Sequence, residues 1–229
     1  MGCRDGYRSD LNKNGREGCS SPEKFTANSP YESNLNKLMR YLYLKTPPIG
    51  FGVGLVGQYH DIANSLSLCH GDVNSKDCAA CVVEASGEIR KRCPYNKGSV
   101  IWYDNCLVKY SNTDVFSKID IGNKFYLWNE RNVSNPLSFN QKTKNLLRQL
   151  SQQAYVAPKM YATGELKLRY SEKLYGLVQC TRDLSSVDCK KCLDRIISEL
   201  PSCCDGQEGG RVVGGSCNFR YEIYPFVNV

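Results

Sequence analysis

An internal repeat of cysteines constrains the fold of this chain more than any other feature. Five cysteines recur further along the chain at a constant offset of 111 residues, with no gap. The pairs are Cys69 and Cys180, Cys78 and Cys189, Cys81 and Cys192, Cys93 and Cys204, and Cys106 and Cys217. Such self-similarity predicts two homologous domains in tandem. We expect a first domain over residues 16–114 and a second over residues 124–229, after an N-terminal extension over residues 1–15.

The cysteine content indicates how these domains are stabilised. The chain has 13 cysteines among 229 residues but only two histidines, so a metal cluster would need nearly all-thiolate ligation. Oxidised bridges in a secreted protein are the better interpretation of this density. The Cys-x2-Cys pairs at Cys78 and Cys189 do not lie in a βαβ pattern, which disfavours thioredoxin-type redox chemistry. Because the count is odd, at least one thiol lacks an intrachain partner.

Composition and charge exclude several classes of protein. No stretch approaches the roughly 20 apolar residues that cross a bilayer, so we expect no membrane segment in this chain. Residues 1–20 are polar, so we expect no signal peptide in it either. The net charge of +7 favours weak association with anionic cell-wall or membrane surfaces. The basic run at Arg90, Lys91 and Arg92 complements the end of a predicted helix, and we expect no nucleic-acid partner.

Motifs for catalysis are not recognisable in the sequence. The two histidines lie outside any nucleophile motif, and the glycine-rich segment at residues 209–215 is not followed by a helix that could bind phosphate. We therefore expect no enzymatic activity, no catalytic residue, no metal and no cofactor.

Helix and strand signals flank the repeated cysteines. Residues 173–180 are rich in β-formers and predict a strand. A helix follows, capped by Ser185 or Ser186 and ended by Pro201. In the first repeat the predicted cap of the corresponding helix is Ser75.

The remaining segments complete the predicted architecture. Earlier helices are expected after residues 29–35 and after residues 137–141, where leucines recur at helical spacing. Residues 100–110 and 211–226 alternate in the manner of strands. The expected fold class is α+β, with two tandem homologous domains that each pack an antiparallel sheet against two helices.

Two motifs resemble those of a plant protein family. Cys-x8-Cys-x2-Cys occurs twice, beginning at Cys69 and Cys180, and the chain closes with Cys217-Asn-Phe-Arg-Tyr-Glu-Ile-Tyr-Pro-Phe226. Both resemble the cysteine-rich ginkbilobin-homologous, or stress-antifungal, domain, which occurs as a tandem pair in cysteine-rich receptor-like protein kinases and cysteine-rich repeat secretory proteins. The resemblance implies an α+β fold stapled by disulfides. It also implies an extracellular location, in the apoplast or on the outer face of the plasma membrane, and a role in defence, stress signalling or the regulation of channels between cells.

A pattern of disulfide bonds is also implied by the resemblance. The corresponding pairs are Cys19–Cys93, Cys69–Cys78, Cys81–Cys106, Cys180–Cys189 and Cys192–Cys217. The expected partner of Cys204 is missing, because Trp128 stands where the family has a cysteine. Cys3, Cys203 and Cys204 are thus unassigned, and both a vicinal Cys203–Cys204 bridge and a link from Cys3 to either one are open. A strained vicinal bridge acting as an extracellular redox sensor is a minor hypothesis.

Some relatives bind mannose through an asparagine, an arginine and a glutamate at set distances from the bridging cysteines. The corresponding residues are Asn129, Arg211 and Glu222 in the second domain, and Ser20, Val100 and Ser111 in the first. Sugar hydroxyls donate and accept hydrogen bonds at once, so a carboxylate beside a charged or amide donor suits them. In the alternative, structural interpretation, Arg211 and Glu222 form a cross-strand ion pair worth under ~1 kcal/mol.

Two functions are compatible with these features. The first is a non-enzymatic extracellular recognition module in plant defence or stress signalling, which binds an extracellular protein, peptide or co-receptor. It would be a secreted repeat protein or a receptor-kinase ectodomain, and a transmembrane segment and kinase encoded beyond Val229 would favour the latter. The second is a lectin-like antifungal protein that binds mannose-containing glycans through the second domain. Asn132 begins an Asn-Val-Ser sequon, which predicts N-glycosylation.

Overall fold

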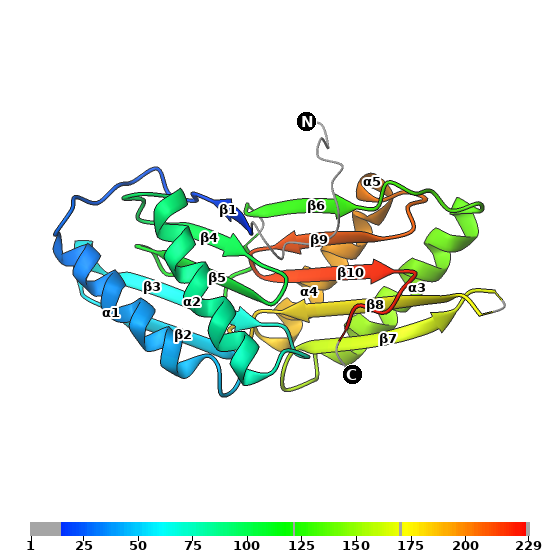
Figure 1. Cartoon of the computed structure of the whole chain (residues 1–229), viewed down its shortest axis with the longest axis horizontal. Coiled ribbons are helices and arrows are strands. Elements are labelled where there is room, and N and C mark those ends of the chain that lie inside the picture. Colours follow the sequence, from blue (N-terminus) through cyan, green and yellow to red (C-terminus); the bar gives the residue numbers. More distant parts are fainter. Residues whose placement is uncertain (1–14, 121, 170, 228–229) are drawn as a thin grey trace. The chain divides into compact units, whose positions relative to one another are not determined.

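The computed structural model describes residues 15–120, 122–169 and 171–227. The chain forms two compact units that divide between Ser117 and Lys118. Their described parts are named repeat one (residues 15–117) and repeat two (residues 118–227). Each contains a five-stranded antiparallel sheet and two long helices, so the predicted α+β fold class is confirmed (Figure 1).

Repeat one packs both of its long helices on one sheet. Its elements are β1 (Arg16–Gly18), α1 (Pro30–Lys45), β2 (Phe51–Val56), the 3-10 turn η1 (Tyr59–Asp61), β3 (Ala63–Cys69), α2 (Ser75–Arg92), β4 (Ser99–Trp102) and β5 (Cys106–Ser111). The strands lie in the order β1-β4-β5-β3-β2. α1 packs mainly on β2 and β3, and α2 packs on β4 and β5 and against α1. β1 and β2 are therefore the two edges of the sheet.

Repeat two has the same topology. Its elements are β6 (Lys124–Trp128), α3 (Pro136–Ala154), β7 (Tyr161–Lys167), β8 (Lys173–Cys180), α4 (Ser186–Ser198), the short helix α5 (Leu200–Cys203), β9 (Gly210–Gly214) and β10 (Cys217–Glu222). The strand order is β6-β9-β10-β8-β7, which matches repeat one position for position. The predicted strand at residues 173–180 is β8, and the predicted strand region at residues 211–226 is a hairpin of β9 and β10.

Side-chain caps set the ends of the second helix in each repeat. Ser185 caps α4 as predicted, because its hydroxyl accepts a hydrogen bond from the N–H of Asp188 at 3.1 Å. The prediction that Ser75 caps α2 is wrong by one residue. Asn74 is the cap, since its side-chain oxygen accepts from the N–H of Asp77 at 2.9 Å. Pro201 does not end α4 directly but lies in the first turn of α5, where a missing N–H costs little.

The two repeats bury equivalent positions on their first helices. Six buried residues of repeat one match six buried residues of repeat two at an offset of 108. They are Tyr31, Leu35, Leu38, Met39, Leu42 and Thr46, over Phe139, Thr143, Leu146, Leu147, Leu150 and Ala154. This offset relates every position on α1 to a position on α3, including the exposed ones.

Candidate functional site

A shared backbone hydrogen bond locates Asn129, the first of the predicted sugar-binding residues. β6 pairs with β9 in the same register as β1 pairs with β4. The N–H of Ser20 then donates to the carbonyl of Gly98, and the N–H of Asn129 donates to that of Gly209, both at 2.9 Å. Asn129 therefore occupies the position of Ser20, and Trp128 occupies the position of the bridging cysteine of repeat one.

Arg211 and Glu222 lie on neighbouring strands and on the same face of the sheet. Arg211 of β9 is directly opposite Arg220 of β10, and Glu222 follows Arg220 by two residues. Phe219 and Tyr221, at the alternate positions, join the hydrophobic core, so the three charged side chains occupy the other face. Arg211 and Glu222 are 2% and 0% exposed. Both charges are thus held in the interior.

Gly209 leaves the space that the carboxylate of Glu222 fills. A Cβ atom at Gly209 would collide with that carboxylate. Since Asn129 is hydrogen-bonded to Gly209, the structure brings Asn129, Gly209 and Glu222 together. Arg211 lies two residues beyond Gly209 in the chain.

Arg220 belongs to this cluster, and the sequence reasoning missed it. Its Nε donates to Oε1 of Glu222 at 3.1 Å, and its guanidinium lies 4.4 Å from the ring centroid of Phe226. The alternation of Arg220 and Glu222 along one strand was the available signal, because residues two apart share a face. Glu222 therefore forms an ion pair with Arg220 of its own strand, β10. The sequence suggested an ion pair with Arg211 of the neighbouring strand. Asn129, Arg211, Arg220 and Glu222 are named the repeat-two cluster.

The corresponding positions in repeat one carry no carboxylate. Ser20, Val100 and Ser111 stand in place of Asn129, Arg211 and Glu222. The hydroxyl of Ser111 lies 3.0 Å from that of Thr113. Of the two sets of equivalent positions, only the one in repeat two therefore has charged side chains.

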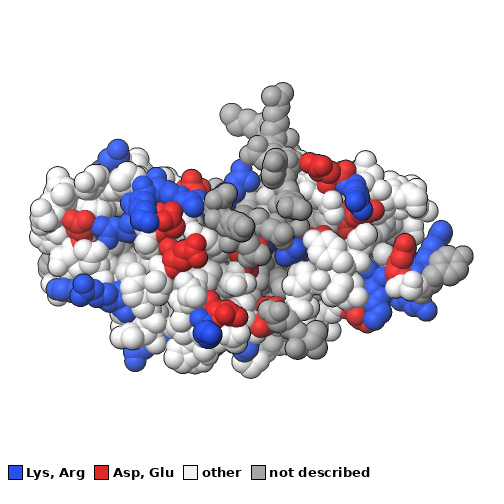
Figure 2. Space-filling view, in the orientation of Figure 1, with Lys and Arg blue, Asp and Glu red and all other residues white. Residues whose placement is uncertain are grey.

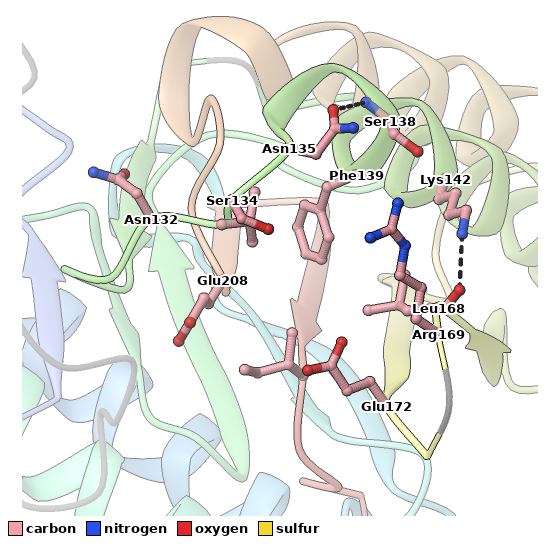
Figure 3. A pocket seen from close by; sticks show the side chains of 12 residues that line it. Asn132, Ser134, Asn135, Ser138, Phe139, Lys142, Leu168, Arg169, Glu172 and Glu208 are labelled. Carbon is pink, nitrogen blue, oxygen red and sulfur yellow. Dashed lines mark hydrogen bonds between the residues drawn. The ribbon is translucent and has the colours of Figure 1, made fainter.

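A cavity of about 390 Å³ lies at the start of α3 (Figure 3). Two of its lining residues are sequence neighbours of residues at the repeat-two cluster. Glu208 and Ile223 line it, and they adjoin Gly209 and Glu222. The ring of Phe139 and the charged groups of Lys142, Arg169, Glu172 and Glu208 contribute to the lining. The Nζ of Lys142 donates to the carbonyl of Leu168 at 3.1 Å, which joins α3 to the segment after β7. An aromatic ring among polar groups suits an amphipathic small ligand.

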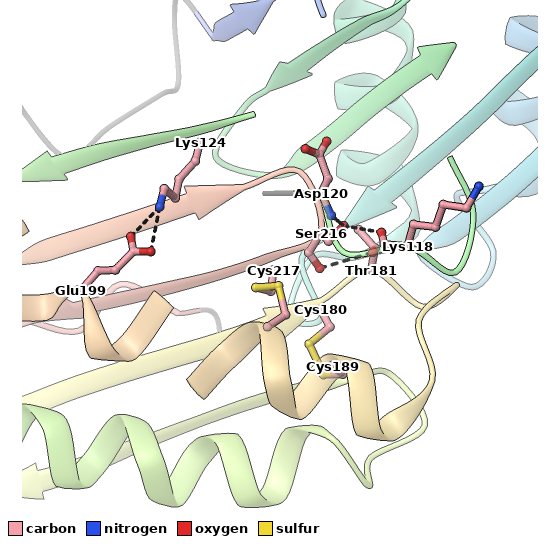
Figure 4. The surroundings of a disulfide bond; sticks show 10 residues. Lys118, Asp120, Lys124, Cys180, Thr181, Cys189, Glu199, Ser216 and Cys217 are labelled. Carbon is pink, nitrogen blue, oxygen red and sulfur yellow. Dashed lines mark hydrogen bonds and ion pairs between the residues drawn. A yellow bond between two sulfur atoms is a disulfide. The ribbon is translucent and has the colours of Figure 1, made fainter. Parts of the chain in front are cut away.

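Six disulfide bonds stabilise the described residues. They are Cys19–Cys93, Cys69–Cys78, Cys81–Cys106, Cys180–Cys189, Cys192–Cys217 and Cys203–Cys204. The first five pairs are those that the family resemblance implies. In each repeat, two of them join the second helix to strands of the sheet, as Cys180 and Cys217 illustrate (Figure 4).

The sixth disulfide joins neighbours in the chain. Cys203 and Cys204 bond to each other at the end of α5, which is one of the arrangements that the sequence left open. Cys3, the third unassigned cysteine, lies outside the described residues. The carbonyl of Cys204 accepts a hydrogen bond from the hydroxyl of Tyr221 at 3.1 Å, and its sulfur packs where Gly210 has no side chain. The bridge is therefore part of the core, with Cys203 9% and Cys204 0% exposed.

Polar contacts hold β6, which lacks the disulfide that lies next to β1 in repeat one. The Nζ of Lys124 lies 2.7 Å from the carboxylate of Glu199 (Figure 4). The hydroxyl of Tyr126 donates to the same carboxylate at 2.8 Å. Burial lowers the pKa of Lys124, but the hydrogen bonds to Glu199 and Tyr126 outweigh it and raise that pKa above its ordinary value. Trp128, in place of the cysteine, packs against the core.

Asn132, the predicted glycosylation site, lies in the segment between β6 and α3. It is exposed and forms an isolated bridge with Gln207. Its side chain points away from the other labelled residues around the cavity (Figure 3). An oligosaccharide attached there would extend into solvent.

Two kinds of feature are absent from the described residues. Histidine, cysteine and carboxylate side chains do not gather there in any group of three or more that could hold a metal ion. Within residues 15–120, 122–169 and 171–227, no helix is long and apolar enough to cross a membrane.

Comparison with known proteins identifies relatives along both repeats. Residues 18–113 and 128–224 each match the family described as salt stress response/antifungal. The antimicrobial ginkbilobin-2-like protein of Castanea crenata is 61% identical over 210 residues, which cover 92% of this chain and 87% of that protein. Cysteine-rich repeat secretory protein 38 of Arabidopsis thaliana is 57% identical over 212 residues, which cover 91% and 84%.

Solved structures share the same architecture. The tandem DUF26 ectodomain of the Arabidopsis thaliana cysteine-rich receptor-like protein PDLP8 superimposes with a TM-score of 0.80 at 25% identity. The match covers 92% of this chain and 98% of that one. The ectodomain of PDLP5 gives a TM-score of 0.76 at 23% identity, which is a likeness of fold.

Proposed function

Because the chain belongs to the salt stress response/antifungal family of cysteine-rich repeat proteins, we propose that it is a non-enzymatic extracellular recognition protein of plant defence. The observation that carries the proposal is the 61% identity to an antimicrobial ginkbilobin-2-like protein across both repeats. Six disulfides suit an oxidising compartment, which supports the apoplast as its location. We favour a secreted protein over a receptor ectodomain, since the relatives at 57% and 49% identity are named secretory proteins.

Fungal growth in the presence of the oxidised, purified chain tests this proposal. We expect inhibition of hyphal growth that increases with protein concentration and disappears when the disulfides are reduced and alkylated. A Cys19→Ala/Cys93→Ala variant, which lacks the bridge between β1 and the end of α2, is expected to inhibit less at elevated temperature. Growth that is equal with the oxidised protein and with buffer would contradict an antifungal role.

The second candidate function is binding of mannose-containing glycans through the repeat-two cluster. It is supported by the carboxylate of Glu222 beside the guanidinium of Arg220 and by the position of Asn129 next to Gly209. Vicinal sugar hydroxyls would donate to the carboxylate and accept from the guanidinium. Since Arg211 and Glu222 are buried, a sugar can contact them only when the structure around them opens locally. The apparent affinity is then the affinity of the open form multiplied by the fraction of molecules that are open.

Glycan-array binding, followed by titration with mannose, tests this second function. Glu222→Gln keeps the shape of the side chain and removes its charge, and Gly209→Ala displaces the carboxylate without removing any polar group. Both substitutions are expected to weaken mannose binding by tenfold or more, on the order of the 1.4 kcal/mol of one charge-assisted hydrogen bond. Glu199→Gln, which removes a carboxylate charge at the other end of β6, is the matched control.

The outcomes of that titration are distinct. Binding that is unchanged in Glu222→Gln and in Arg211→Ala would exclude the repeat-two cluster as the sugar site. Loss of mannose binding in Phe139→Ala alone would assign the sugar to the cavity at the start of α3. Fungal inhibition that persists in a variant without mannose binding would favour a protein partner.

We also propose that Asn132 carries an N-linked glycan. Its support is the sequon and the exposure of Asn132, whose side chain points away from the other labelled residues around the cavity. Expression in plant cells is expected to give a protein whose mass falls on peptide-N-glycosidase treatment, and Asn132→Gln should remove that difference. An unmodified Asn132 peptide in the mass spectrum of the secreted protein would contradict the assignment.

A further inference from the structure

The edge strand β2 of repeat one is apolar and lacks charge. Its sequence is Phe-Gly-Val-Gly-Leu-Val, and no charged residue occurs between Lys45 and Asp61. Val53 and Leu55 are 39% and 53% exposed on the face away from α1, whereas Gly54 packs against α1. Edge strands of soluble proteins are normally protected by charged residues, prolines or covering segments, because their backbone groups can pair with another chain. β2 has none of these residues along its length.

The outer face of α1, beside β2, is basic and apolar. Five exposed residues recur there at helical spacing, and they are Lys37, Arg40, Tyr41, Leu44 and Lys45. The ring of Tyr41 reaches β2, where it would contact a Cβ atom at Gly54. Within the described part of the chain, the three cations have no carboxylate at ion-pair distance. Figure 2 shows blue side chains at its lower left, where Figure 1 places α1 and β2.

The equivalent surface of repeat two is polar. The register of β7 with β8 places Thr163 and Glu165 where repeat one has Val53 and Leu55. Glu165 is exposed and pairs with Lys173 at 2.6 Å. The offset of 108 along the first helices places Asn145, Gln149, Gln152 and Gln153 where α1 has Lys37, Tyr41, Leu44 and Lys45, and Arg148 where it has Arg40. The fold therefore requires neither the apolar edge nor Lys37 and Lys45 of α1, since repeat two forms the same strand and helix without them.

We propose that β2 of repeat one pairs with an extended, acidic segment of an extracellular protein partner. An added strand hydrogen-bonds to the outer edge of β2 at Val53 and Leu55, and its side chains alternate between the two faces of the sheet. Those on one face would contact Val53 and Leu55, and those on the other would lie beside Tyr41 and the cations of α1. The partner segment therefore alternates apolar and acidic residues. The residues Lys37, Arg40, Tyr41, Leu44, Lys45, Val53 and Leu55 are named the β2 edge surface.

Charge complementarity distinguishes this partner from a second copy of the chain. Two β2 strands that paired antiparallel about a two-fold axis would bring two α1 helices together on the same face. Lys37, Arg40 and Lys45 of each copy would then face the same cations of the other. Like charges in this position are destabilising, whereas an acidic segment is attracted. An edge strand also favours an extended peptide as partner over a membrane surface, because a membrane has no backbone groups that could pair with the strand.

The test uses the full chain and a synthetic peptide of about ten residues that alternates valine and glutamate, labelled for fluorescence anisotropy. The variant Val53→Thr/Leu55→Glu gives β2 the residues of β7 at the same register, so it is expected to fold. We expect it to weaken peptide binding at least tenfold, and Lys37→Asn/Lys45→Gln to weaken it severalfold and to reduce its salt dependence. Thr163→Val/Glu165→Leu in repeat two is the matched control and should leave binding by repeat one unchanged.

Controls separate this proposal from its alternatives. Equal affinity for a valine–lysine peptide, or equal affinity of the Val53→Thr/Leu55→Glu variant for the valine–glutamate peptide, would overturn the proposal. Dimerisation of the chain that this variant abolishes, measured by sedimentation, would assign the edge to a second copy and overturn it as well. Binding to phosphatidylserine vesicles that depends on Lys37 and Lys45 but not on Val53 would also overturn the proposal. The repeat-two cluster is left intact in every variant, so mannose binding is an independent readout.

Discussion

The end of the second helix differs between the two repeats, although the cysteine there is at an equivalent position. In repeat one, Cys93 is bonded to Cys19 next to β1, which ties the sheet edge to the helix covalently. Repeat one also has an ion pair between Arg92 and Glu17 of β1. In repeat two, Cys204 is bonded to its neighbour Cys203, and β6 is held by the packing of Trp128 and by the Lys124–Glu199 pair without a disulfide. The comparison teaches that a cross-link in this fold can be replaced by packing and polar contacts while strand order and register are kept.

The surfaces of the repeats have diverged further than their cores. Buried helix positions and strand registers match, yet repeat one has an apolar, basic edge at β2 and repeat two has the cluster around Glu222. Core positions are constrained by close packing, whereas exposed positions can change at little cost in stability. The two repeats therefore present different surfaces on the same framework, and these are the surfaces that we propose for recognition.

Removal of the disulfides should produce the largest difference between the repeats. Cys19 and Cys93 are 74 residues apart, so Cys19→Ala/Cys93→Ala frees a long loop in the unfolded state and should lower the free energy of unfolding by on the order of 4 kcal/mol. Cys203 and Cys204 are adjacent, and Cys203→Ala/Cys204→Ala should cost about 1 kcal/mol through lost packing. Urea unfolding with hydrogen exchange resolved to each repeat measures both. Equal losses would contradict the proposed replacement of the covalent tie.

Substitution of the equivalent tyrosines should give the next largest effect. Tyr110 donates to the carbonyl of Asn96 at 3.1 Å, and Tyr221 donates to those of Gln207 at 3.3 Å and Cys204 at 3.1 Å. We expect Tyr110→Phe and Tyr221→Phe each to lower the free energy of unfolding by about 1 kcal/mol at neutral pH. Tyr221→Phe should cost more, because its hydroxyl has two acceptors.

The same tyrosines should make stability fall at alkaline pH. Burial raises the pKa of Tyr110 and of Tyr221 above the ordinary value, and the charge of Glu222 raises that of Tyr221 further. Their neutral forms therefore stabilise the folded state fully below a pH of about 10, and this contribution is lost as the pH rises toward the folded-state pKa. Unfolding measured from pH 9 to 11 should show a shallower decline in the Tyr→Phe variants. A decline as steep as in the wild type would exclude these tyrosines as its cause.

The smallest effect is expected from the polar tie of β6. Glu199→Gln removes the charge that pairs with Lys124 and should cost about 1 kcal/mol or less, with faster amide exchange in β6. Glu88→Gln is the control at the equivalent position. Glu88 pairs with Lys91 and Arg92 of its own helix, and the 3.0 Å pair of Arg92 with Glu17 of β1 stays intact in this variant. β1, retained by its disulfide, should exchange at an unchanged rate. Faster exchange of β1 than of β6 would reverse the comparison.

Much of the framework was predictable because it depends on local patterns. The offset of 111 gave the tandem organisation, and β-rich runs and leucine spacing gave the main helices and the strand at residues 173–180. The cap of α2 was predicted one residue too late, because Asn74 and Ser75 are both good capping residues and Asn74 accepts the hydrogen bond. β2 escaped prediction because its glycines weaken the strand signal, although they are needed for close packing against α1.

The candidate sites were less predictable, because they join residues that are distant in the chain. Asn129, Arg211 and Glu222 were proposed by resemblance, but only the register of β9 with β10 showed that Arg220 lies opposite Arg211 and pairs with Glu222. The β2 edge surface combines a helix face with an edge strand. Neither is recognisable as a partner site until the sheet order places β2 at the edge.

The sequence by itself determined that this protein is a tandem of two disulfide-stapled α+β domains, because cysteine spacing and hydrophobic periodicity are local or exactly repeated along the chain. Tertiary structure alone decided that Cys204 bonds to Cys203, that Glu222 is buried beside Gly209, and that β2 is an edge strand of its sheet. The physical reason is that strand pairing and close packing bring together segments far apart in the chain, and one residue of register changes which side chains share a face.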